Sequence, residues 1–443
     1  MAATSPAGDR AGLRRVGLQR GGVPRPTGRG FGVLAGGVVL VGVGWLLSSG
    51  PLVFAGLTLV VLIVAVVVSL LFRRADVTVT RRFSPTRGVA GRSVVETMGV
   101  SPRRREGGTV ALRDEVPWRR TTLSEAVAVT LEPGRASSAA VRHLDLPRGR
   151  HRVGPLHLEL IESYGVARRR VLAPGTVEFV VLPEALDLGL ARESRSLGDG
   201  ARRQREHSLA GGEDDPIARE YRRGDPMRRV HWKATARHGE LMVRQEEQHG
   251  LPRARVVLGT ASEGWSDVRP SSGTHDLASD AFEWAVSACA TIGVEFGRAG
   301  SLTIVSTPDG DLLARHDPDD TSGFLDALAD IELDGPAPEP APAPTAREPV
   351  VAVVSGLQEA ELEHLARGRA VGATAVAIVV HPSLAFTERR RGAGAGAGSG
   401  SSTSPVAPDR VAATLREAGW RVVEASSGDD RSQVIVSSGA FDD

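Results

Sequence analysis

The sequence predicts a two-helix transmembrane hairpin, followed by a β-sandwich-like segment and then by an α/β domain. Three patterns indicate this organisation: two uncharged apolar runs near the N-terminus, a series of short alternating runs separated by Gly and Pro, and a final region in which apolar strands alternate with amphipathic helices. The chain has 443 residues, about three times the roughly 150 residues of a typical domain. More than one folded unit is therefore expected.

The composition is that of a chain that mostly folds in water. Hydrophobic residues make up 41% and charged residues 24%, which argues against a disordered, collagen-like or multi-span membrane protein. Lys and Arg number 54 against 53 Asp and Glu, and aromatic residues make up 4%, so we expect no nucleic-acid partner. Cys289 is the single cysteine, which excludes an internal disulfide and a cysteine-rich zinc site.

The predicted hairpin consists of two runs without a charged side chain, residues 31–47 and 51–72. A bilayer core of about 30 Å needs roughly 20 helical residues, so the second run spans it and the first spans it with a few flanking residues. The link Ser48–Gly50 is too short for any other element, so the helices must be antiparallel neighbours. Glycines of the first run are expected to allow close backbone approach: Gly36, Gly37, Gly42 and Gly44.

Arginines flank both ends of the hairpin and predict a two-pass plasma-membrane protein with both termini in the cytoplasm, where basic residues are enriched. They are Arg10, Arg14, Arg15, Arg20, Arg25 and Arg29 before it, and Arg73, Arg74, Arg81 and Arg82 after it. Residues 1–30 are expected to form a flexible basic arm drawn to anionic lipid. A signal peptide is the alternative, but its apolar stretch is usually shorter and is followed by a cleavage site.

Short alternating runs from residue 75 to residue 185 predict an antiparallel β-sandwich. The expected strands are 77–83, 93–100, 110–116, 126–133, 156–162 and 177–183. In one of them Leu156, Leu158 and Leu160 point to the core face and His157 and Glu159 to the solvent face.

Two basic clusters, Arg103–Arg105 and Arg168–Arg170, interrupt this pattern. Contact with lipid headgroups or with an acidic partner is one interpretation. We favour solvated turns, because that is the commoner meaning of a short charge run.

The region 250–443 predicts a mainly parallel sheet covered by helices on both faces. Expected strands are 254–260, 301–307, 349–357, 374–382 and 420–426, and expected helices are 276–296, 321–331 and 408–418. The first helix carries an apolar stripe of Leu277, Ala281, Trp284, Ala288 and Ile292. The Pro-rich stretch 335–349 predicts an extended connection, and the Gly-rich stretch 392–404 predicts a flexible loop.

The densest motif covers residues 220–247. Asp225 is a good N-cap, Pro226 suits the first helical position, and Gly239 can end a helix in a left-handed conformation, so we predict a helix over 226–238. A strand over 240–247 follows.

Basic and apolar groups mix on this predicted helix, with Val230, Ala234 and Arg237 on one face. Such mixing favours a structural joint between the two domains, in which Trp232 buries the most area. Acids that could pair with the arginines are Asp214, Asp215, Glu220 and Glu246.

The motif resembles the actinobacterial-type members of the domain-of-unknown-function family 58, whose hallmark is a Tyr, Gly-Asp-Pro, Arg, Trp-Lys, Ala-Arg series. The matching residues are Tyr221, Gly224, Asp225, Pro226, Arg229, Trp232, Lys233, Ala236, Arg237, Gly239, Glu240 and Val243. The resemblance implies a motif segment over 186–249 and a von Willebrand factor A-like (Rossmann-like) domain over 250–443. An upstream family segment is also similar, but Glu162, Ser163 and Tyr164 replace its Asp-Pro-Phe before Gly165.

The resemblance also allows a test for a metal ion. Von Willebrand A domains that hold a divalent cation place Asp-x-Ser-x-Ser after the first strand, because these side chains supply hard oxygen ligands. Here Gly259 replaces the acid and Ala261 replaces the first Ser, while Thr260, Ser262 and Glu263 remain. We therefore expect a degenerate site without a metal, and no cofactor.

The resemblance implies a membrane-anchored interaction or scaffold protein, an adaptor that works with a MoxR-type AAA ATPase and a transglutaminase-like membrane protein in assembly or maturation of envelope-linked complexes. Joint or partner-binding candidates are Tyr221, Gly224, Asp225, Pro226, Arg229, Trp232, Lys233 and Arg237.

The alternative is an enzyme of unknown reaction that uses Asp225, His231, Lys233 and His238 as acid–base groups. Against it, Asp225 already has a capping role, and His231 and Lys233 diverge because they lie two apart on a helix. The sequence also contains no phosphate loop, HExxH or GxSxG motif.

Overall fold

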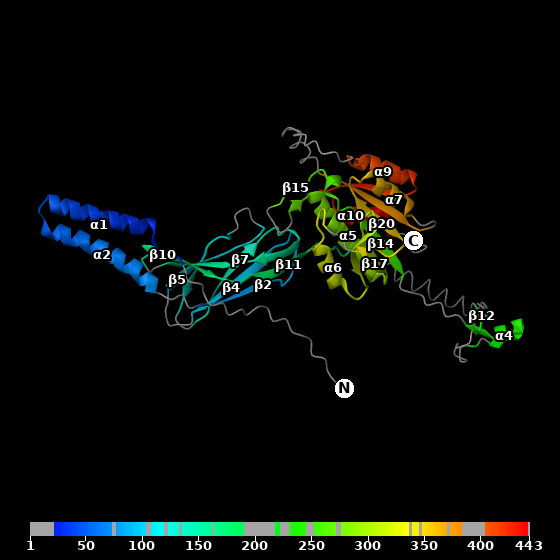
Figure 1. The fold of residues 1–443 in the computed structure, drawn as a ribbon, viewed down its shortest axis with the longest axis horizontal. Coiled ribbons are helices and arrows are strands. Elements are labelled where there is room, and N and C mark those ends of the chain that lie inside the picture. The colour runs from blue at the N-terminus through cyan, green and yellow to red at the C-terminus, as the bar shows by residue number, and fades with distance from the viewer. Residues whose placement is uncertain are drawn as a thin grey trace. The chain divides into compact units, whose positions relative to one another are not determined.

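The chain forms two compact units, which Figure 1 shows in a computed structural model. Unit 1 comprises Met1–Glu184, Arg269–Ala278 and Ala329–Glu332, and unit 2 comprises Ala185–Val268, Ser279–Leu328 and Leu333–Asp443. The structure describes residues 22–72, 77–102, 108–118, 123–132, 135–161, 164–189, 218–221, 230, 232–244, 252–271, 276–335, 339–344, 348–369, 373–382 and 404–441.

Helices α1 (Gly28–Leu46) and α2 (Gly50–Phe72) form a hairpin at the start of unit 1. Helix α1 begins three residues before the predicted run, because the Thr27 hydroxyl accepts a hydrogen bond from Gly30 N at 3.2 Å and caps the helix. Both helices are long and apolar enough to cross a membrane, and only 17% and 11% of their apolar windows are buried. Core helices of a soluble protein would instead be mostly buried.

Three glycines bring the two helix backbones together. A Cβ atom at Gly37 would lie 3.0 Å from the Gly56 carbonyl oxygen, and a Cβ atom at Gly56 would lie 2.6 Å from the Gly37 oxygen. A Cβ atom at Gly44 would lie 2.7 Å from a backbone nitrogen of α2. Gly36 and Gly42 do not take part as predicted: a Cβ atom at either would meet nothing within 4 Å, since helical periodicity turns them away from α2.

The predicted β-rich region is confirmed as a set of mostly antiparallel sheets. The strands are β1 (Arg25–Pro26), β2 (Val77–Ser84), β3 (Gly88–Val89), β4 (Val94–Pro102), β5 (Gly108–Asp114), β6 (Val127–Leu131), β7 (Ser137–His143), β8 (Gly149–Val153), β9 (Leu156–Ile161), β10 (Ala167–Ala173) and β11 (Val177–Leu182). Their orders are β1-β10-β9-β5-β6, β2-β4-β7 and β3-β11-β8. Every pairing in these sheets is antiparallel except that of β11 with β3.

The first two of these sheets share one hydrophobic core. Val79 and Met98 of the β2-β4-β7 sheet pack in the same cluster as Leu112, Leu156 and Leu158 of the other sheet. Each of these side chains is at most 8% exposed. Packing of two apolar sheet faces is what the alternating sequence pattern requires.

The structure corrects two details of strands β9 and β10. Glu159 is buried rather than solvent-facing, because Arg168 Nη1 lies 2.9 Å from its Oε1 atom. Arg168–Arg170 lie within strand β10 rather than in a solvated turn. The other cluster, Arg103–Arg105, lies outside the described residues.

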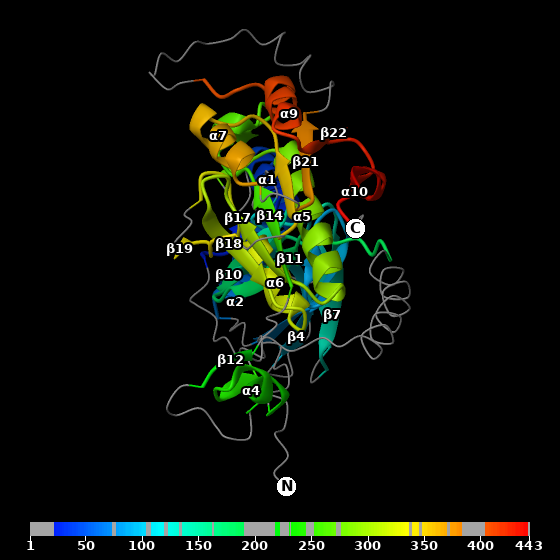
Figure 2. The same cartoon turned by 90° about the vertical axis from the view of Figure 1, so that its right-hand side faces the viewer.

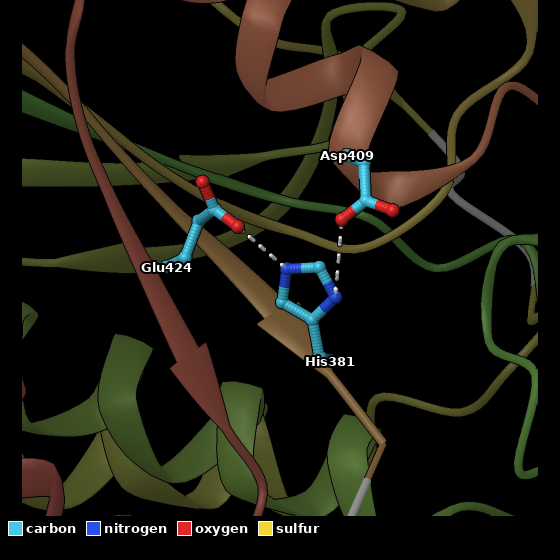
Figure 3. Close-up of side chains that lie close together, drawn as sticks. All are labelled: His381, Asp409 and Glu424. Carbon is cyan, nitrogen blue, oxygen red and sulfur yellow. Dashed lines mark ion pairs between the residues drawn. The ribbon is translucent and has the colours of Figure 1, made fainter. Parts of the chain in front are cut away.

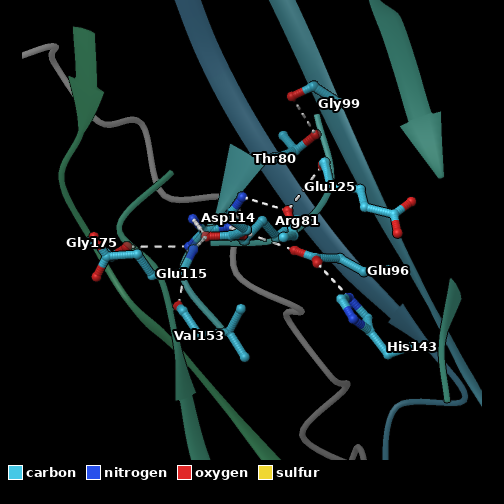
Figure 4. A network of polar contacts seen from close by, with 11 residues as sticks. Thr80, Arg81, Glu96, Gly99, Asp114, Glu115, Glu125, His143, Val153 and Gly175 are labelled. Atoms are coloured by element: carbon cyan, nitrogen blue, oxygen red, sulfur yellow. Dashed lines mark hydrogen bonds and ion pairs between the residues drawn. The ribbon is translucent and has the colours of Figure 1, made fainter. Parts of the chain in front are cut away.

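A buried ion-pair cluster connects the sheets of unit 1 (Figure 4). On strand β2, Arg81 places Nε 2.7 Å from Asp114 Oδ2 and Nη2 2.7 Å from Asp114 Oδ1, on strand β5. Its Nη1 donates to the carbonyl oxygen of Val153 on strand β8 at 3.3 Å. Glu96 Oε1 lies 3.8 Å from Arg81 Nε, and Glu96 Oε2 lies 2.9 Å from His143 Nε2. One guanidinium thus contacts all three sheets.

The cluster sets one cation against two carboxylates that are both fully buried. Burial is the main cause that raises the pKa of Asp114 to about 8, helped by the nearby Glu96 carboxylate and opposed by the Arg81 guanidinium. A proton on Asp114 removes one of the two carboxylate charges that face Arg81. The fold therefore favours a cluster that retains one proton.

Unit 2 contains a seven-stranded sheet of order β19-β18-β17-β14-β20-β21-β22. Figure 2 labels β19, β18, β17, β14, β21 and β22 of this sheet, and Figure 1 labels β20. Five strands are parallel to one another: β14 (Arg253–Leu258), β17 (Leu302–Ser306), β20 (Val350–Val354), β21 (Ala375–His381) and β22 (Arg421–Ser426). Strand β18 (Asp311–His316) pairs antiparallel with β17 on one side and with β19 (Glu339–Pro340) on the other. The helices are α5 (Asp280–Arg298), α6 (Thr321–Ala329), α7 (Glu359–Arg367), α9 (Pro408–Glu417) and α10 (Arg431–Ser438).

Helices cover both faces of this sheet, and every residue of β20 is consequently buried. Ala352 and Val354 belong to one hydrophobic cluster with residues of α7 and α9. Val351 and Val353 alternate onto the opposite face, and α5 contacts β14, β17, β20 and β21. A mainly parallel sheet between helices confirms the predicted α/β organisation.

Three helical details differ from the prediction. Helix α5 begins at Asp280 because the Ser279 side chain accepts a hydrogen bond from Phe282 N. Leu277 therefore lies in the short strand β16 (Leu277–Ala278), which pairs with β15 (Arg269–Pro270), and not on the helix. Helices α7 and α10 are additional to those predicted.

Side chains at Gly56 should separate the hairpin helices, because a Cβ atom there would meet α1 backbone atoms. We expect Gly56→Val to cost about 1 to 3 kcal/mol through overpacking. The measurement is the thermal unfolding of the full chain in detergent. Gly36→Val is the matched control and should melt like the parent, since its Cβ atom meets nothing within 4 Å. Equal losses in both variants would contradict this account of helix packing.

The buried cluster should make the stability of unit 1 fall as the pH rises. In the folded state Asp114 keeps its proton up to about pH 8, whereas in the unfolded chain it releases the proton above the ordinary aspartate pKa of 3.8. The contribution of Asp114 to the free energy of unfolding is therefore fully present below pH 3.8 and is lost as the pH rises through about 8. Calorimetric melting of the full chain at several pH values measures this. Asp114→Asn carries an amide that cannot ionise and should flatten the slope; an unchanged slope in that variant would exclude Asp114 as the titrating group.

Candidate functional site

The predicted motif forms a small helix-and-hairpin element in unit 2. Strands β12 (Ala218–Glu220) and β13 (Met242–Arg244) pair antiparallel, and helix α4 (Trp232–His238) lies between them in sequence. Gly239 ends the helix with a φ of 77°, as predicted, and its N–H donates to Thr235 O at 2.9 Å. The Thr235 hydroxyl accepts from Met242 N at 3.1 Å, which connects the helix to β13.

The structure describes four of the eight predicted motif residues. Tyr221, Trp232, Lys233 and Arg237 are within the described part, and the Tyr221 N–H donates to Leu241 O at 2.8 Å. Gly224, Asp225, Pro226 and Arg229 lie outside the described residues, as does His231 of the alternative enzyme set. The predicted capping by Asp225 and any convergence of Asp225 with His231 and Lys233 therefore stay predictions.

Trp232 is 67% exposed in the described part of the chain, and its predicted burial in a joint between the two domains stays a prediction. Trp232 is exposed because the element formed by α4, β12 and β13 is small. Helix α4 has seven residues and packs on a two-stranded sheet, and such an element is too thin to enclose an indole. The side chain is left as an exposed aromatic surface.

A second candidate region is the carboxyl edge of the parallel sheet, the usual ligand position in open α/β folds. Strand β14 lies between β17 and β20 there, so the chain reverses its direction of travel across the sheet at this point. The loop after β14 runs into a short 3₁₀ helix, Ser262–Gly264. This is the loop whose Gly259, Ala261 and Glu263 were predicted to leave a metal site incomplete.

Polar groups of this loop are already bonded within the protein. Ser262 N donates to Asp334 Oδ1 at 2.7 Å, and Asp334 N donates to Thr260 O at 2.9 Å. Glu263 Oε2 accepts from Gln358 Nε2 at 2.7 Å. Asp334 brings a carboxylate that the sequence pattern could not assign to this loop, because it lies about seventy residues further along the chain.

A third cluster joins three elements at the same edge of the sheet (Figure 3). His381 ends strand β21, Asp409 lies in the first turn of α9, and Glu424 lies on β22. His381 Nε2 is 3.2 Å from Glu424 Oε2, and His381 Nδ1 is 4.0 Å from Asp409 Oδ1. The sequence analysis did not predict this cluster. A His at the end of an apolar strand is visible in the sequence, but its two acidic neighbours lie on separate elements.

The His381 cluster can hold a cation only in competition with an arginine. One nitrogen and two carboxylate oxygens lie within 4.8 Å of one another, a donor set that divalent transition metals accept. However, Arg416 Nη2 lies 2.5 Å from Glu424 Oε1, and this hydrogen bond is the main cause that lowers the pKa of Glu424. Asp409 is also 86% exposed. The arrangement is better suited to an ion-pair network that links α9, β21 and β22.

Part of the chain matches a known protein family. Residues 217–384 match a family described as protein of unknown function DUF58. This match covers the motif element, strand β14 and the loop after it, and it ends just beyond His381. No curated protein matches the chain.

Several solved structures show weak similarity. A CARDB domain from Pyrococcus furiosus in complex with di-metal ions is 14% identical, with a TM-score of 0.19, over 24% of this chain and 88% of that chain. A β-glucosidase from Listeria innocua in complex with glucose is 11% identical, with a TM-score of 0.16, over 24% and 16%. The sporulation control protein Spo0M from Bacillus subtilis is 14% identical, with a TM-score of 0.15, over 27% and 54%. Such low scores carry no argument about fold or function.

Magnesium is expected not to bind at the loop after β14, because Gly259 and Ala261 supply no ligand and Glu263 is held by Gln358. Calorimetric titration of the full chain with magnesium chloride measures this. The isotherms of the parent and of Thr260→Ala should superimpose. A one-to-one site in the parent that Thr260→Ala abolishes would show that the loop does coordinate the ion.

Proposed function

We propose that this chain is a membrane-anchored adaptor that works with a MoxR-type AAA ATPase, and with a transglutaminase-like membrane protein, in assembly or maturation of envelope-linked complexes. Helices α1 and α2 cross the plasma membrane in this proposal, and both termini are cytoplasmic. The arginines on both sides of the hairpin support that orientation.

The apolar surface of the hairpin supports the membrane anchor. Phe54 is 74% exposed, Leu46 80% and Val39 62%, on two helices without a charged residue between Phe31 and Phe72. Soluble monomers rarely expose contiguous apolar patches of more than a few hundred Å². A lipid environment removes this surface from water.

Unit 2 is a von Willebrand factor A-like binding domain in this proposal, without the metal-dependent mode of binding. Its parallel strands and its two helical layers support that assignment. The bonded state of the loop after β14 supports the loss of metal binding, since the Glu263 carboxylate already accepts a hydrogen bond from Gln358. A partner would therefore be recognised elsewhere on the chain.

The observation that carries the adaptor proposal is the exposed Trp232 on α4, within the family-matched residues. Tryptophan is enriched at the energetic centres of protein–protein interfaces, where it is buried on binding. Arg237 is exposed on the same short helix, and arginine is the other residue type enriched at such centres. The element thus presents an interface surface and not a packed core.

Trp232→Ala should weaken partner binding while leaving the fold intact. Loss of a central interface aromatic costs about 2 kcal/mol or more, or roughly thirtyfold in affinity. The measurement is the amount of MoxR-type ATPase that co-purifies with the full chain from detergent-solubilised membranes, with the melting temperature recorded in parallel.

Leu144→Ala is the matched control, because Leu144 is a large apolar side chain of similar exposure, 62%, in unit 1. It should leave ATPase recovery at the parental level. Equal recovery of the ATPase with Trp232→Ala and the parent, or no ATPase with the parent, would refute the adaptor role of this surface.

A further inference from the structure

A basic cavity of about 280 Å³ lies in unit 1, beside the start of the hairpin. It is lined by Gly22, Val23, Arg25, Arg168 and Arg170. Three of these five residues are arginines, and they come from two segments that are far apart in sequence. The cavity therefore exists because the fold brings two basic strands together.

Pairing of β1 with β10 builds the cavity. Arg25 lies directly opposite Arg168 in the antiparallel register. Gly22 N donates to Arg170 O at 2.9 Å and Thr27 N donates to Val166 O at 2.9 Å, so the pairing continues on both sides of β1. Like charges directly opposite each other in a sheet are destabilising. This register therefore carries a repulsion between Arg25 and Arg168 that a bound anion would reduce.

Two side-chain hydrogen bonds and one close backbone approach connect these strands to the hairpin. The Thr27 hydroxyl donates to Gly165 O at 2.6 Å while it caps α1. Arg169 Nη1 donates to Leu70 O at 2.9 Å, near the last residue of α2. A Cβ atom at Gly30 would lie 2.0 Å from Val166 O, so α1 packs backbone to backbone on the start of β10. Strand β10 is thus attached to the ends of both helices.

The attachment to the hairpin sets the level of the cavity relative to the bilayer. The 19 residues of α1 rise about 28 Å, close to the roughly 30 Å of a bilayer core. Arg25 precedes the first helical residue, Gly28, by three positions. Its guanidinium is therefore placed at the level of the lipid headgroups when the hairpin is inserted.

The charge of the cavity is positive. Arg168 Nη1 lies 2.9 Å from Glu159 Oε1 and Arg170 Nε lies 3.9 Å from the same atom. Within the described residues Arg25 has no ion pair, so three guanidinium groups share one carboxylate. Arg168 and Arg170 also keep 47% and 65% of their side-chain surface exposed. The excess positive charge points to an anionic ligand.

We propose that this cavity binds the headgroup phosphate of an anionic phospholipid in the cytoplasmic leaflet. Guanidinium groups match phosphate oxygens with paired hydrogen bonds, and basic pockets at the cytoplasmic ends of transmembrane helices are where such headgroups bind. The lipid phosphate offsets the repulsion between Arg25 and Arg168 and couples β10 to the membrane surface. This inference rests on the proposed membrane anchoring.

The test uses the full chain in detergent micelles that contain phosphatidylglycerol or phosphatidylcholine, and native mass spectrometry counts the bound lipids. The parent should retain phosphatidylglycerol preferentially. Arg25→Gln/Arg170→Gln should lower the ratio of bound phosphatidylglycerol to phosphatidylcholine at least about tenfold. Arg152→Gln, an exposed arginine on strand β8, is the matched control and should keep the parental ratio.

Arg25→Gln alone is the second variant, because Arg25 has no ion pair within the described residues and its loss leaves Glu159 paired. It should lower the ratio with an unchanged melting temperature in lipid-free micelles. If both variants keep the parental ratio of phosphatidylglycerol to phosphatidylcholine, the proposal is overturned. Full displacement of the lipid by excess inorganic phosphate would also overturn it, because it would indicate a site for the free ion. Carbonate extraction of membranes tests the anchor separately: an extracted chain refutes the anchoring, and a retained chain with equal binding of both lipids refutes only this site.

Discussion

One buried guanidinium, that of Arg81, connects the sheets of unit 1. The packing around it depends on the charges of the neighbouring carboxylates. Arg81 forms two short contacts with Asp114 and also reaches a carbonyl group on strand β8, so three sheets converge on one side chain. A buried ion pair adds little net stability, but removing one partner leaves a charge that water cannot reach. Glu96 would leave an excess negative charge, which a proton on Asp114 removes. The contacts that connect the three sheets therefore depend on the protonation of Asp114.

The hairpin imposes a second constraint on unit 1, because it holds two helix ends close together. Close approach at Gly37, Gly44 and Gly56 sets the spacing of these ends. Gly165, two residues before strand β10, accepts a hydrogen bond from Thr27, the capping residue of α1, and Arg169 on β10 donates to Leu70 O near the end of α2. A cluster of arginines that a short charge run would place in a solvated turn is instead part of this attachment.

In unit 2 the sheet and the motif element serve different purposes. The sheet is covered on both faces, and at its carboxyl edge Glu263 and His381 are held by neighbouring side chains. The motif element is thin, and it leaves Trp232 exposed. An interaction role for the family-matched region is consistent with this division, since the large aromatic group lies outside the packed layers.

Periodicity and spacing in the sequence determined the apolar hairpin, the parallel strands of unit 2 and the end of α4 at Gly239, because these features depend on neighbouring residues alone. In unit 1 they determined β2, β4, β5, β6, β9 and β11, but not β7, β8 or β10. Side-chain neighbours from distant segments could not be predicted in this way. The pairing of Arg81 with Asp114, the bond between Asp334 and the loop after β14, and the position of Arg168 in a strand all require strand order and register. Tertiary structure decided these contacts, since burial and electrostatics act between atoms that only the folded chain brings together.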